Sequence, residues 1–376
     1  MTRRVMFHVQ HLLGIGHVVR ATRIARALAA GPFEVDLVMG GPAIAGLDAG
    51  RARLVPLPPV RAGAGGFSEL VDADGAPLTE AAKDARRDAL LAHFDAFAPD
   101  ILLIEAFPFG RRQMRFELLP LLERAHGRAA RPLIACSVRD ILQQERRPGR
   151  AESYCDLVER YFDLVLVHGD PALAAFGGSF ALADRIADRI RYTGLVGPGA
   201  LTPAAEAHDV IVSAGGGAVG HDLIRAALRA KPLTRLADAR WLVATGPNAT
   251  DDFVRELAAP GVTATRFLPD LPQRMMNAQV SISQAGYNTV ADLLAARCKA
   301  VLAPYATGGE TEQSKRAELM ERRGLAVVAK DLSQAPFAAA IDAAIQLPGA
   351  RMDVALGGAE SATRILESGS RGFGEN

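Results

Sequence analysis

The chain has 376 residues, a length that predicts two domains at roughly 100 to 200 residues per domain. Hydrophobic residues make up 49% of it and charged residues 23%, values that exclude a disordered, collagen-like or coiled-coil protein. The 43 basic and 42 acidic residues leave a net charge of +1. We therefore expect no nucleic-acid partner, because binding a polyanion needs a positive field.

The sequence gives little indication of a membrane span, a signal peptide or paired cysteines. No stretch approaches the roughly 18 consecutive apolar residues of a membrane span, and His8, Gln10 and His11 interrupt the apolar segment that a signal peptide would need. The three cysteines are far apart and form no CxxC pair, so we expect neither disulfides nor a zinc site. These features predict a protein of the reducing cytoplasm, either free or at the inner face of the membrane.

Short apolar runs alternate with longer segments of helical period, a pattern typical of parallel α/β layers. The expected strands of the first half are 4–9, 34–39, 101–105, 132–137 and 163–168. The expected strands of the second half are 209–213, 240–245, 262–267, 279–283 and 299–303. The expected helices are 17–30, 79–97, 111–126, 219–231, 287–297, 311–323 and 353–368. Each half thus opens with a strand, a glycine-rich turn and a helix, as two nucleotide-binding units would.

A segment rich in Gly and Pro and without clear period, 196–208, indicates a boundary between domains. We expect an N-terminal Rossmann-like domain over 1–195, this segment as linker, and a C-terminal Rossmann-like domain over 209–350. The remainder, 351–376, is expected to form a helix that packs back on the first domain. Residues 58–78 contain several prolines and glycines and predict a long loop.

The first glycine-rich turn, 14–20, joins an expected strand to an expected helix. Free N–H groups at a helix N-terminus carry partial positive charge. This charge disfavours a protonated ring, so we expect the pKa of His17 to be lowered and His17 to serve as a general base. The alternative is a histidine that only makes local hydrogen bonds. The turn does not match the dinucleotide motif, because Arg20 occupies the position of its third glycine.

The second glycine-rich turn, 213–220, matches GxGxxG through Gly215, Gly217 and Gly220 and predicts a diphosphate site at a helix N-terminus. Binding of NAD would also need an acidic residue after the next strand, and WLVATGPN offers none. A tight turn without a ligand is the alternative.

Two further turns of the second half carry polar side chains. Gly286 follows an expected strand and opens a helix, where backbone amides can face a phosphate, and Asp292 in that helix is positioned to accept ribose hydroxyls. Glu312 and Gln313 are adjacent hydrogen-bonding groups of the kind that bind sugar hydroxyls. Each residue would equally fit a solvated helix start.

In the first half, Glu105, Arg139, Asp140 and His168 all fall at the ends of expected parallel strands, the edge where α/β sheets bind ligands. Asp140 is the second candidate, after His17, for a catalytic or acceptor-binding residue.

Two local patterns leave alternatives open. Residues 107–116 mix aromatic and cationic side chains, which predicts either a contact with a lipid carrier or membrane surface, or the half-buried start of an amphipathic helix. The DxD sequence at 72–74 lies in the irregular stretch, so we interpret it as a turn rather than a metal motif.

The sequences GIGHVVR, SAGGGAVG, SQAGYNTVADLLAARCKAVLAPY and ETEQSKRAELM together resemble glycosyltransferases of the GT-B architecture. The resemblance is to family 28, whose best-known member adds N-acetylglucosamine to a lipid-linked peptidoglycan precursor, and also to a bacterial group of predicted glycosyltransferases. It implies an α/β fold with two Rossmann-like domains facing a central cleft. The implied activity is inverting, metal-independent and cofactor-free: a hexosyl group moves from a UDP-sugar to a hydroxyl acceptor in cell-envelope or glycoconjugate synthesis. A lipid-linked alcohol is one candidate acceptor.

The resemblance carries over residue by residue. His17 would be the base, with Asp140 second, and no metal ligand is implied. The implied donor-binding residues are Gly16, Ser213, Gly215, Gly216, Gly217, Phe267, Gly286, Asn288, Thr289, Asp292, Glu312 and Gln313. The peptidoglycan enzyme has Glu at the position of Asp292 and paired glutamines at 312–313, so the donor sugar is not implied.

Three other functions stay open. A nucleotide-sugar hydrolase of pseudaminic-acid synthesis has a similar GxGHxxR turn, and water replaces the acceptor there. An NAD-binding protein would rest on GGGAVG alone, and an epimerase of the same architecture has less motif support.

Overall fold

A computed structural model of the chain describes residues 2–44, 46–63, 66–143, 147–214, 220–246, 249–306, 310–349 and 352–369. The chain divides into two compact units. The first comprises Met1–Val196 and Gly357–Asn376, and the second comprises Gly197–Leu356. Each unit is built on a parallel β-sheet with helices, which confirms the α/β fold expected from the alternating pattern.

The sheet of the first unit has the strand order β3-β2-β1-β6-β7-β8-β9, and every neighbouring pair is parallel. The strands are β1 (Arg3–Val9), β2 (Phe33–Met39), β3 (Arg53–Pro56), β6 (Ile101–Glu105), β7 (Leu133–Arg139), β8 (Leu164–His168) and β9 (Ile190–Tyr192). The central strands are nearly fully buried, so their apolar runs were visible in the sequence. The sheet edges β3 and β9 are largely exposed and lack such runs.

Residues 58–78 are not the irregular loop that the sequence predicts. Within them β4 (Arg61–Gly63) and β5 (Gly66–Val71) pair as an antiparallel hairpin. The backbone N–H of Ala62 donates to the carbonyl of Leu12 at 3.0 Å, so contacts distant in sequence order this stretch.

The DxD sequence forms a turn, as predicted. Oδ1 of Asp72 accepts hydrogen bonds from the backbone N–H groups of Asp74 and Ala76, both at 3.0 Å. Its carboxylate therefore serves the local backbone.

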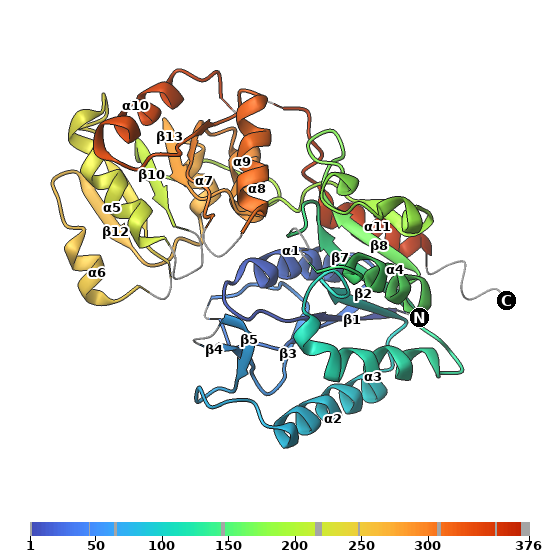
Figure 1. Ribbon diagram of the computed structural model, residues 1–376. Helices are drawn as coiled ribbons and strands as arrows, with labels where there is room; N and C mark the ends of the chain where they lie inside the picture. Colours follow the sequence, from blue (N-terminus) through green and yellow to red (C-terminus); the bar gives the residue numbers. More distant parts are fainter. Residues whose placement is uncertain are drawn as a thin grey trace. The chain divides into compact units, whose positions relative to one another are not determined.

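Helices cover both faces of the first sheet, with α1 and α11 on one face and α2 and α3 on the other (Figure 1). The α-helices of this unit are α1 (Gly16–Ala30), α2 (Glu80–Phe97), α3 (Arg115–His126), α4 (Arg150–Tyr161) and α11 (Gly358–Gly369). Short 3-10 helices are η1 (Arg112–Met114), η2 (Phe176–Gly178) and η3 (Ala183–Arg189).

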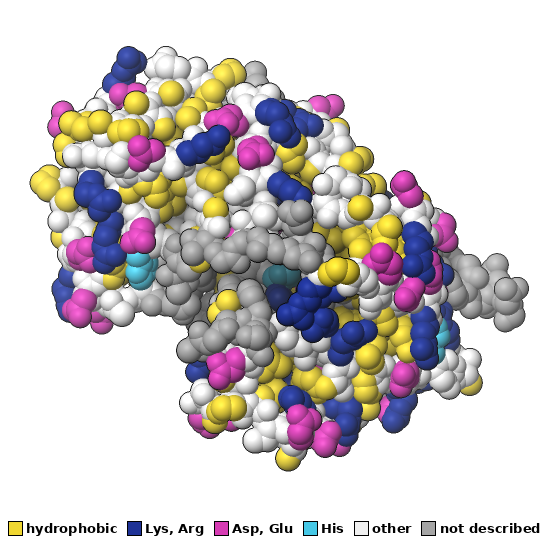
Figure 2. Space-filling model, viewed as in Figure 1, with side chains coloured by type: hydrophobic (Ala, Val, Ile, Leu, Met, Phe, Trp, Pro, Cys, Tyr) yellow, Lys and Arg dark blue, Asp and Glu magenta, His cyan; other side chains and the backbone are white. Residues whose placement is uncertain are grey.

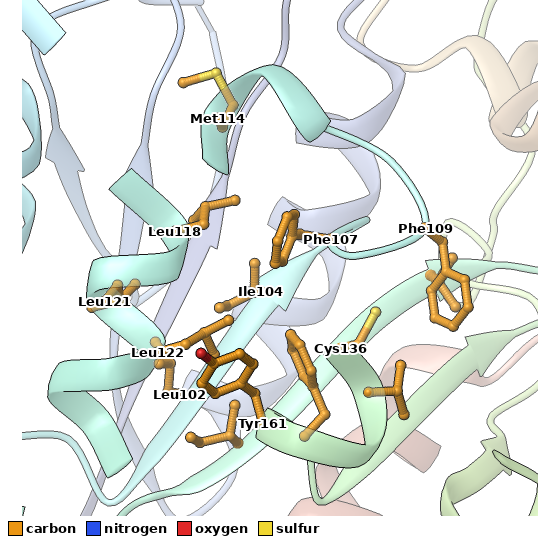
Figure 3. Packing of buried hydrophobic residues seen from close by; sticks show 14 of the residues in the cluster. Leu102, Ile104, Phe107, Phe109, Met114, Leu118, Leu121, Leu122, Cys136 and Tyr161 are labelled. Atoms are coloured by element: carbon orange, nitrogen blue, oxygen red, sulfur yellow. The ribbon is translucent and has the colours of Figure 1, made fainter. Parts of the chain in front are cut away.

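The core beneath α3 fixes strand β6. Leu118, Leu121 and Leu122 of α3 pack toward Leu102 and Ile104 of β6 (Figure 3), and all five side chains are fully buried. Close packing of this kind leaves little freedom for the strand. The carboxyl end of β6 is thus a rigid support for the residue that terminates it.

Helix α11 packs on α1 within the first unit (Figure 1). A Cβ at Gly31 would lie 3.2 Å from Cγ2 of Thr363, and the guanidinium of Arg3 donates to the carbonyl of Glu367 at 3.2 Å. The helix begins at Gly358 rather than at 353, where the sequence predicts its start. The N–H of Gly358 instead donates to the carbonyl of Leu195 at 3.0 Å.

Gly358→Ala should lower the free energy of unfolding by about 1–3 kcal/mol, the usual cost of overpacking. A Cβ there would lie 2.4 Å from the carbonyl oxygen of Gly194, and backbone must move to admit it. Gly357→Ala is the matched control, because its Cβ meets only Oε2 of Glu360 at 3.6 Å. Urea unfolding measures the stability of both variants. Equal stabilities would show that the backbone at 194–195 can shift to admit the Cβ without loss of free energy of unfolding.

The sheet of the second unit has the order β12-β11-β10-β13-β14-β15, again with parallel pairs. Its strands are β10 (Val210–Ser213), β11 (Trp241–Ala244), β12 (Val262–Thr265), β13 (Val280–Ser283), β14 (Ala300–Leu302) and β15 (Val327–Val328). Its helices are α5 (His221–Ala230), η4 (Lys231–Leu233), α6 (Asp251–Glu256), α7 (Leu271–Met275), α8 (Tyr287–Ala296), α9 (Glu312–Arg322) and α10 (Gln334–Ile345). A separate apolar core, which includes Val212, Trp241 and Phe337, lies under this sheet.

Among the residues that the structure describes, no helix is long and apolar enough to cross a membrane. On the face shown in Figure 2, Lys and Arg side chains are interspersed with Asp and Glu.

Candidate functional site

Strand order creates a topological switch in the first unit between β1 and β6, which are neighbours in the sheet but distant in sequence. The connections that follow two such strands diverge, and ligands bind where they separate. Helix α1 follows β1 and begins at Gly16, so His17 lies at its N-terminus, while β6 ends at Glu105. The switch therefore brings the predicted base beside a carboxylate.

His17 and Glu105 form a hydrogen-bonded pair. Nδ1 of His17 lies 3.0 Å from Oε1 of Glu105. A carboxylate only accepts hydrogen bonds, so Nδ1 carries the proton and Nε2 of the neutral ring keeps its lone pair. The His17 side chain is 18% exposed and that of Glu105 is fully buried. The His17 ring is thus fixed by the buried carboxylate of Glu105, and part of the ring remains accessible to solvent.

Arg20, one turn further along α1, keeps Glu105 ionised. Its guanidinium forms an ion pair with Oε1 of Glu105, and both groups are buried. Burial alone would raise the pKa of Glu105, but the charge of Arg20 and hydrogen bonds from His17 and Ser137 hold that pKa well below its usual range.

The pKa of His17 is lowered well below 6.5, in the direction predicted from its helix position. The main cause is burial, followed by the charge of Arg111, while the hydrogen bond to Glu105 opposes the shift. The ring is therefore neutral at pH 7, which general-base chemistry requires.

A buried hydrogen-bond chain supports Glu105 from behind. The hydroxyl of Ser137 donates to Oε2 of Glu105 and lies 2.9 Å from Nε2 of His168, whose Nδ1 lies 2.9 Å from Oγ1 of Thr193. Burial lowers the pKa of His168 to about 3, so its ring is neutral and has one N–H. Because Ser137 gives its proton to Glu105, the N–H of His168 lies on Nε2 and donates to Ser137. The Thr193 hydroxyl lies within hydrogen-bond distance of both Nδ1 of His168 and the carbonyl of Gly194, the latter at 2.8 Å.

Asp140 follows β7 and is nearly inaccessible. It is 1% exposed, and its Oδ1 accepts a hydrogen bond from the N–H of Ile141 at 2.8 Å. A Cβ at Gly169 would lie 2.3 Å from the Asp140 Cβ, so the surroundings are crowded. This geometry favours His17 over Asp140 as the base.

The second unit has its own switch, between β10 and β13, whose terminal residues Ser213 and Ser283 are register partners. A Cβ at Gly220, directly before α5, would lie 2.1 Å from that of Ala214, so the described residues on either side of this turn lie close together. The predicted diphosphate-facing residues at the centre of this turn lie outside the described residues: Gly215, Gly216 and Gly217.

Helix α8 begins at the same switch, directly after Gly286. Over the residues that the structure describes, no side chain caps its N-terminus, and its first turn contains no acidic residue. The partial positive charge there is suited to an anion. Asn288 and Thr289 belong to this first turn and are partly exposed, and Asp292 is buried one turn further on.

Gln313 and Glu312 have structural partners that the sequence did not reveal. Oε1 of Gln313 accepts hydrogen bonds from the N–H groups of Ala285 at 3.2 Å and Tyr305 at 3.1 Å, so it ties the turn after β13 to the turn after β14. Glu312 is buried and pairs with Arg316 at 2.7 Å. Of the Gln313 amide, the NH₂ end is the part left to face a ligand.

Phe267 follows β12 and is 49% exposed. An aromatic ring with this much free surface is suited to contact with a planar group such as a base.

The aromatic residues of 107–116 do not form a membrane-facing surface. Phe107 and Phe109 are 1% and 9% exposed and lie among the packed side chains in Figure 3, and Met114 is fully buried. The segment leads into η1 and α3, and its apolar side chains pack in the hydrophobic core of the first unit. The start of an amphipathic helix therefore accounts for these buried apolar side chains, and contact of the segment's cationic residues with a lipid carrier or membrane surface stays a prediction.

Comparisons with known proteins bear on both units. The family model for the glycosyltransferase family 28 C-terminal domain matches residues 210–345. Residues 210–345 of the second unit are thus similar to the family 28 C-terminal domain. A "UDP-N-acetylglucosamine--N-acetylmuramyl-(pentapeptide) pyrophosphoryl-undecaprenol N-acetylglucosamine transferase" of Herminiimonas arsenicoxydans is 35% identical over 116 residues, 30% of this chain and 32% of that protein. The enzyme of the same name from Thermotoga sp. (strain RQ2) is 29% identical over 122 residues, 32% of this chain and 35% of that protein.

Solved structures extend the similarity to the whole chain. The calicheamicin glycosyltransferase has a TM-score of 0.61 at 16% identity, over 100% of this chain and 96% of that one. MurG of Acinetobacter baumannii has a TM-score of 0.59 at 14% identity, over 97% of this chain and 99% of that one. The fold is therefore that of GT-B glycosyltransferases, as the resemblance implied. In sequence, the matches span about a third of the length of the curated relatives.

All the proposed donor residues except Gly16 fall inside the family 28 domain, whereas His17 and Glu105 lie outside it. Sequence reasoning noted Glu105 at a strand end but did not pair it with His17. The pairing depends on β1 and β6 being neighbours, which no local pattern indicates.

Proposed function

We propose that the chain is an inverting, metal-independent glycosyltransferase that moves a hexosyl group from a nucleoside diphosphate sugar to a hydroxyl acceptor. The observation that carries this proposal is the pairing of His17 with a buried, ionised Glu105 at the switch of the first unit. The family 28 domain of the second unit supports the donor class.

In the proposed mechanism His17 activates the acceptor. Nε2 of the neutral ring removes the hydroxyl proton as the oxygen attacks the anomeric carbon, and the configuration there inverts. Glu105 keeps the ring in the tautomer with Nδ1 protonated and stabilises the imidazolium that forms, as the carboxylate of a catalytic triad does.

The second unit would bind the departing diphosphate. Backbone amides at the N-termini of α5 and α8 would stabilise the negative charge that develops as the glycosidic bond breaks. Asp292 would hold the ribose, and Glu312 with the amide NH₂ of Gln313 the sugar.

UDP is the proposed nucleotide, because the names of the two sequence relatives specify UDP-N-acetylglucosamine. The same names specify an undecaprenol-linked acceptor, so an acceptor of the lipid-linked kind is the first to test here. Asp292 and Glu312 depart from the family pattern, and the sugar is therefore left to experiment.

UDP should raise the melting temperature of the protein and NAD should not. A ligand at 100 times its dissociation constant stabilises the folded state by about 2.7 kcal/mol, a shift that thermal denaturation detects easily. Asp292→Asn should reduce the shift with UDP, and Arg297→Gln, an exposed neighbour, is the matched control.

A shift with NAD and none with UDP would make the protein a dinucleotide binder. Release of free sugar at the full turnover rate without acceptor would make it a hydrolase.

A further inference from the structure

Arg111 is a cation of the first unit that the proposed mechanism does not use. It lies between the end of β6 and η1, and its Nε donates to the backbone carbonyl of Gln10 at 2.7 Å. Gln10 directly follows the last residue of β1, so Arg111 is anchored at the switch that also holds His17 and Glu105.

Most of the hydrogen-bonding capacity of Arg111 has no partner among the described residues. A guanidinium has five N–H donors, and the bond from Nε to Gln10 uses one of them. Among the described residues no carboxylate oxygen lies within 4.0 Å of this side chain, so no ion pair compensates its charge. Buried or half-buried cations normally have such partners.

The charges around Arg111 make this arrangement costly without a ligand. Arg139, at the end of β7, and Arg20 repel it, and Glu105 attracts it. The one attracting carboxylate, that of Glu105, is already paired with Arg20. Burial and these like charges lower the pKa of Arg111 to about 10, and Arg111 in turn lowers the pKa of His11 and His17.

The backbone of Arg111 is also unusual. Its φ of 58° and ψ of 30° place it in the left-handed region, which arginine rarely adopts. Such conformations persist where the surrounding structure holds a side chain for a ligand. Arg112, the next residue, is exposed and has no comparable role.

We propose that Arg111 anchors an oxyanion subsite beside His17, with Arg139 at its edge, and that the subsite binds a phosphoryl group of the acceptor. The planar fork of a guanidinium matches two phosphoryl oxygens. The subsite orients the acceptor so that its hydroxyl meets Nε2 of His17. This inference rests on the proposed function, since it assigns the substrate class of that site.

Two sources could supply a phosphoryl oxyanion, namely the acceptor and the diphosphate of the donor. The acceptor is favoured because Arg111 belongs to the first unit with the base, whereas the diphosphate-binding helix starts belong to the second.

The test is calorimetric titration of the full chain with inorganic pyrophosphate, with and without saturating UDP. Wild-type protein should bind pyrophosphate even when UDP occupies the donor turns. Arg111→Gln should weaken that binding at least tenfold, Arg111→Lys should retain part of it, and Arg112→Gln should change it less than twofold. UDP affinity should stay within twofold in all variants, which also shows that they fold.

Three outcomes would overturn the inference. Pyrophosphate binding that is abolished by UDP, or an Arg111→Gln variant that loses UDP affinity equally, would place the oxyanion on the donor. Unchanged pyrophosphate binding in Arg111→Gln would show that the side chain has no ligand. Failure of the proposed function can be distinguished from failure of this inference. Absence of sugar transfer would contradict the proposed function, whereas the measurement of pyrophosphate binding does not depend on transfer.

Discussion

His17→Ala should lower the rate of sugar transfer by about 10² or more, the loss expected when one general base is removed. The variant eliminates Nε2 but leaves Glu105 paired with Arg20 and Ser137, so no buried charge is stranded. Transfer is followed as UDP release from a UDP-sugar, with a lipid-linked acceptor or with water in its place. The melting shift with UDP should equal that of wild type. Full activity in this variant would remove His17 from the mechanism.

The pH profile gives a second readout for His17. The neutral ring is the active form, and its pKa lies well below 6.5, so the neutral fraction stays near one as the pH falls from 8 toward 6. The transfer rate should therefore be flat through pH 6.5, where an ordinary histidine would be half protonated. A half-maximal rate at pH 6.5 would mean that the base is a solvated histidine and that the Glu105 pair is not the catalytic one.

Arg86→Met should lower the free energy of unfolding by about 3–5 kcal/mol, because it leaves the buried carboxylate of Glu117 without its cation. Nε of Arg86 lies 2.5 Å from Oε2 of Glu117, and both side chains are almost fully buried. The same guanidinium donates to the carbonyl of Gly40 at 2.8 Å and to Oε1 of Gln10 at 2.7 Å, so it also braces the segment that leads to His17.

The double variant Arg86→Met/Glu117→Leu is the matched control. Removing both charges should cost less than removing one, because no unpaired charge remains. Burial raises the pKa of Glu117, but the hydrogen bond from His8 and the charge of Arg86 outweigh it and lower that pKa. The stabilisation from this carboxylate is present at neutral pH and is lost as the pH falls through the lowered pKa. The deficit of Arg86→Met should hence shrink toward pH 4 in urea titrations, and a deficit that grows there would contradict the assignment.

The central strands of both sheets were predictable from the sequence, since burial on both faces makes each of them a continuous apolar run. Edge strands were not, because β3 is mostly exposed and β15 has only the residues Val327–Val328. The hairpin of β4 and β5 was missed for a different reason. Its glycines indicate a loop, and the contact of Ala62 with Leu12 that orders it is distant in sequence.

His17 was recognisable as a candidate base because a histidine at a helix start after a glycine-rich turn is a local pattern. Its lowered pKa, however, comes chiefly from burial and from Arg111, neither of which the turn reveals. Glu312 and Gln313 show the same limit. Their adjacency suggested sugar contacts, but the ion pair with Arg316 and the bonds from Ala285 and Tyr305 appear only in three dimensions.

The polarity of the hydroxyls behind Glu105 has a consequence for catalysis. The hydroxyl of Ser137 donates to Glu105 and the N–H of His168 donates to Ser137, so both of these protons already point toward the carboxylate. In this orientation neither group can accept a proton passed inward from His17 through Glu105. The proton taken up by His17 must therefore leave to solvent from Nε2, so water has to reach the imidazole in each turnover before the next acceptor binds.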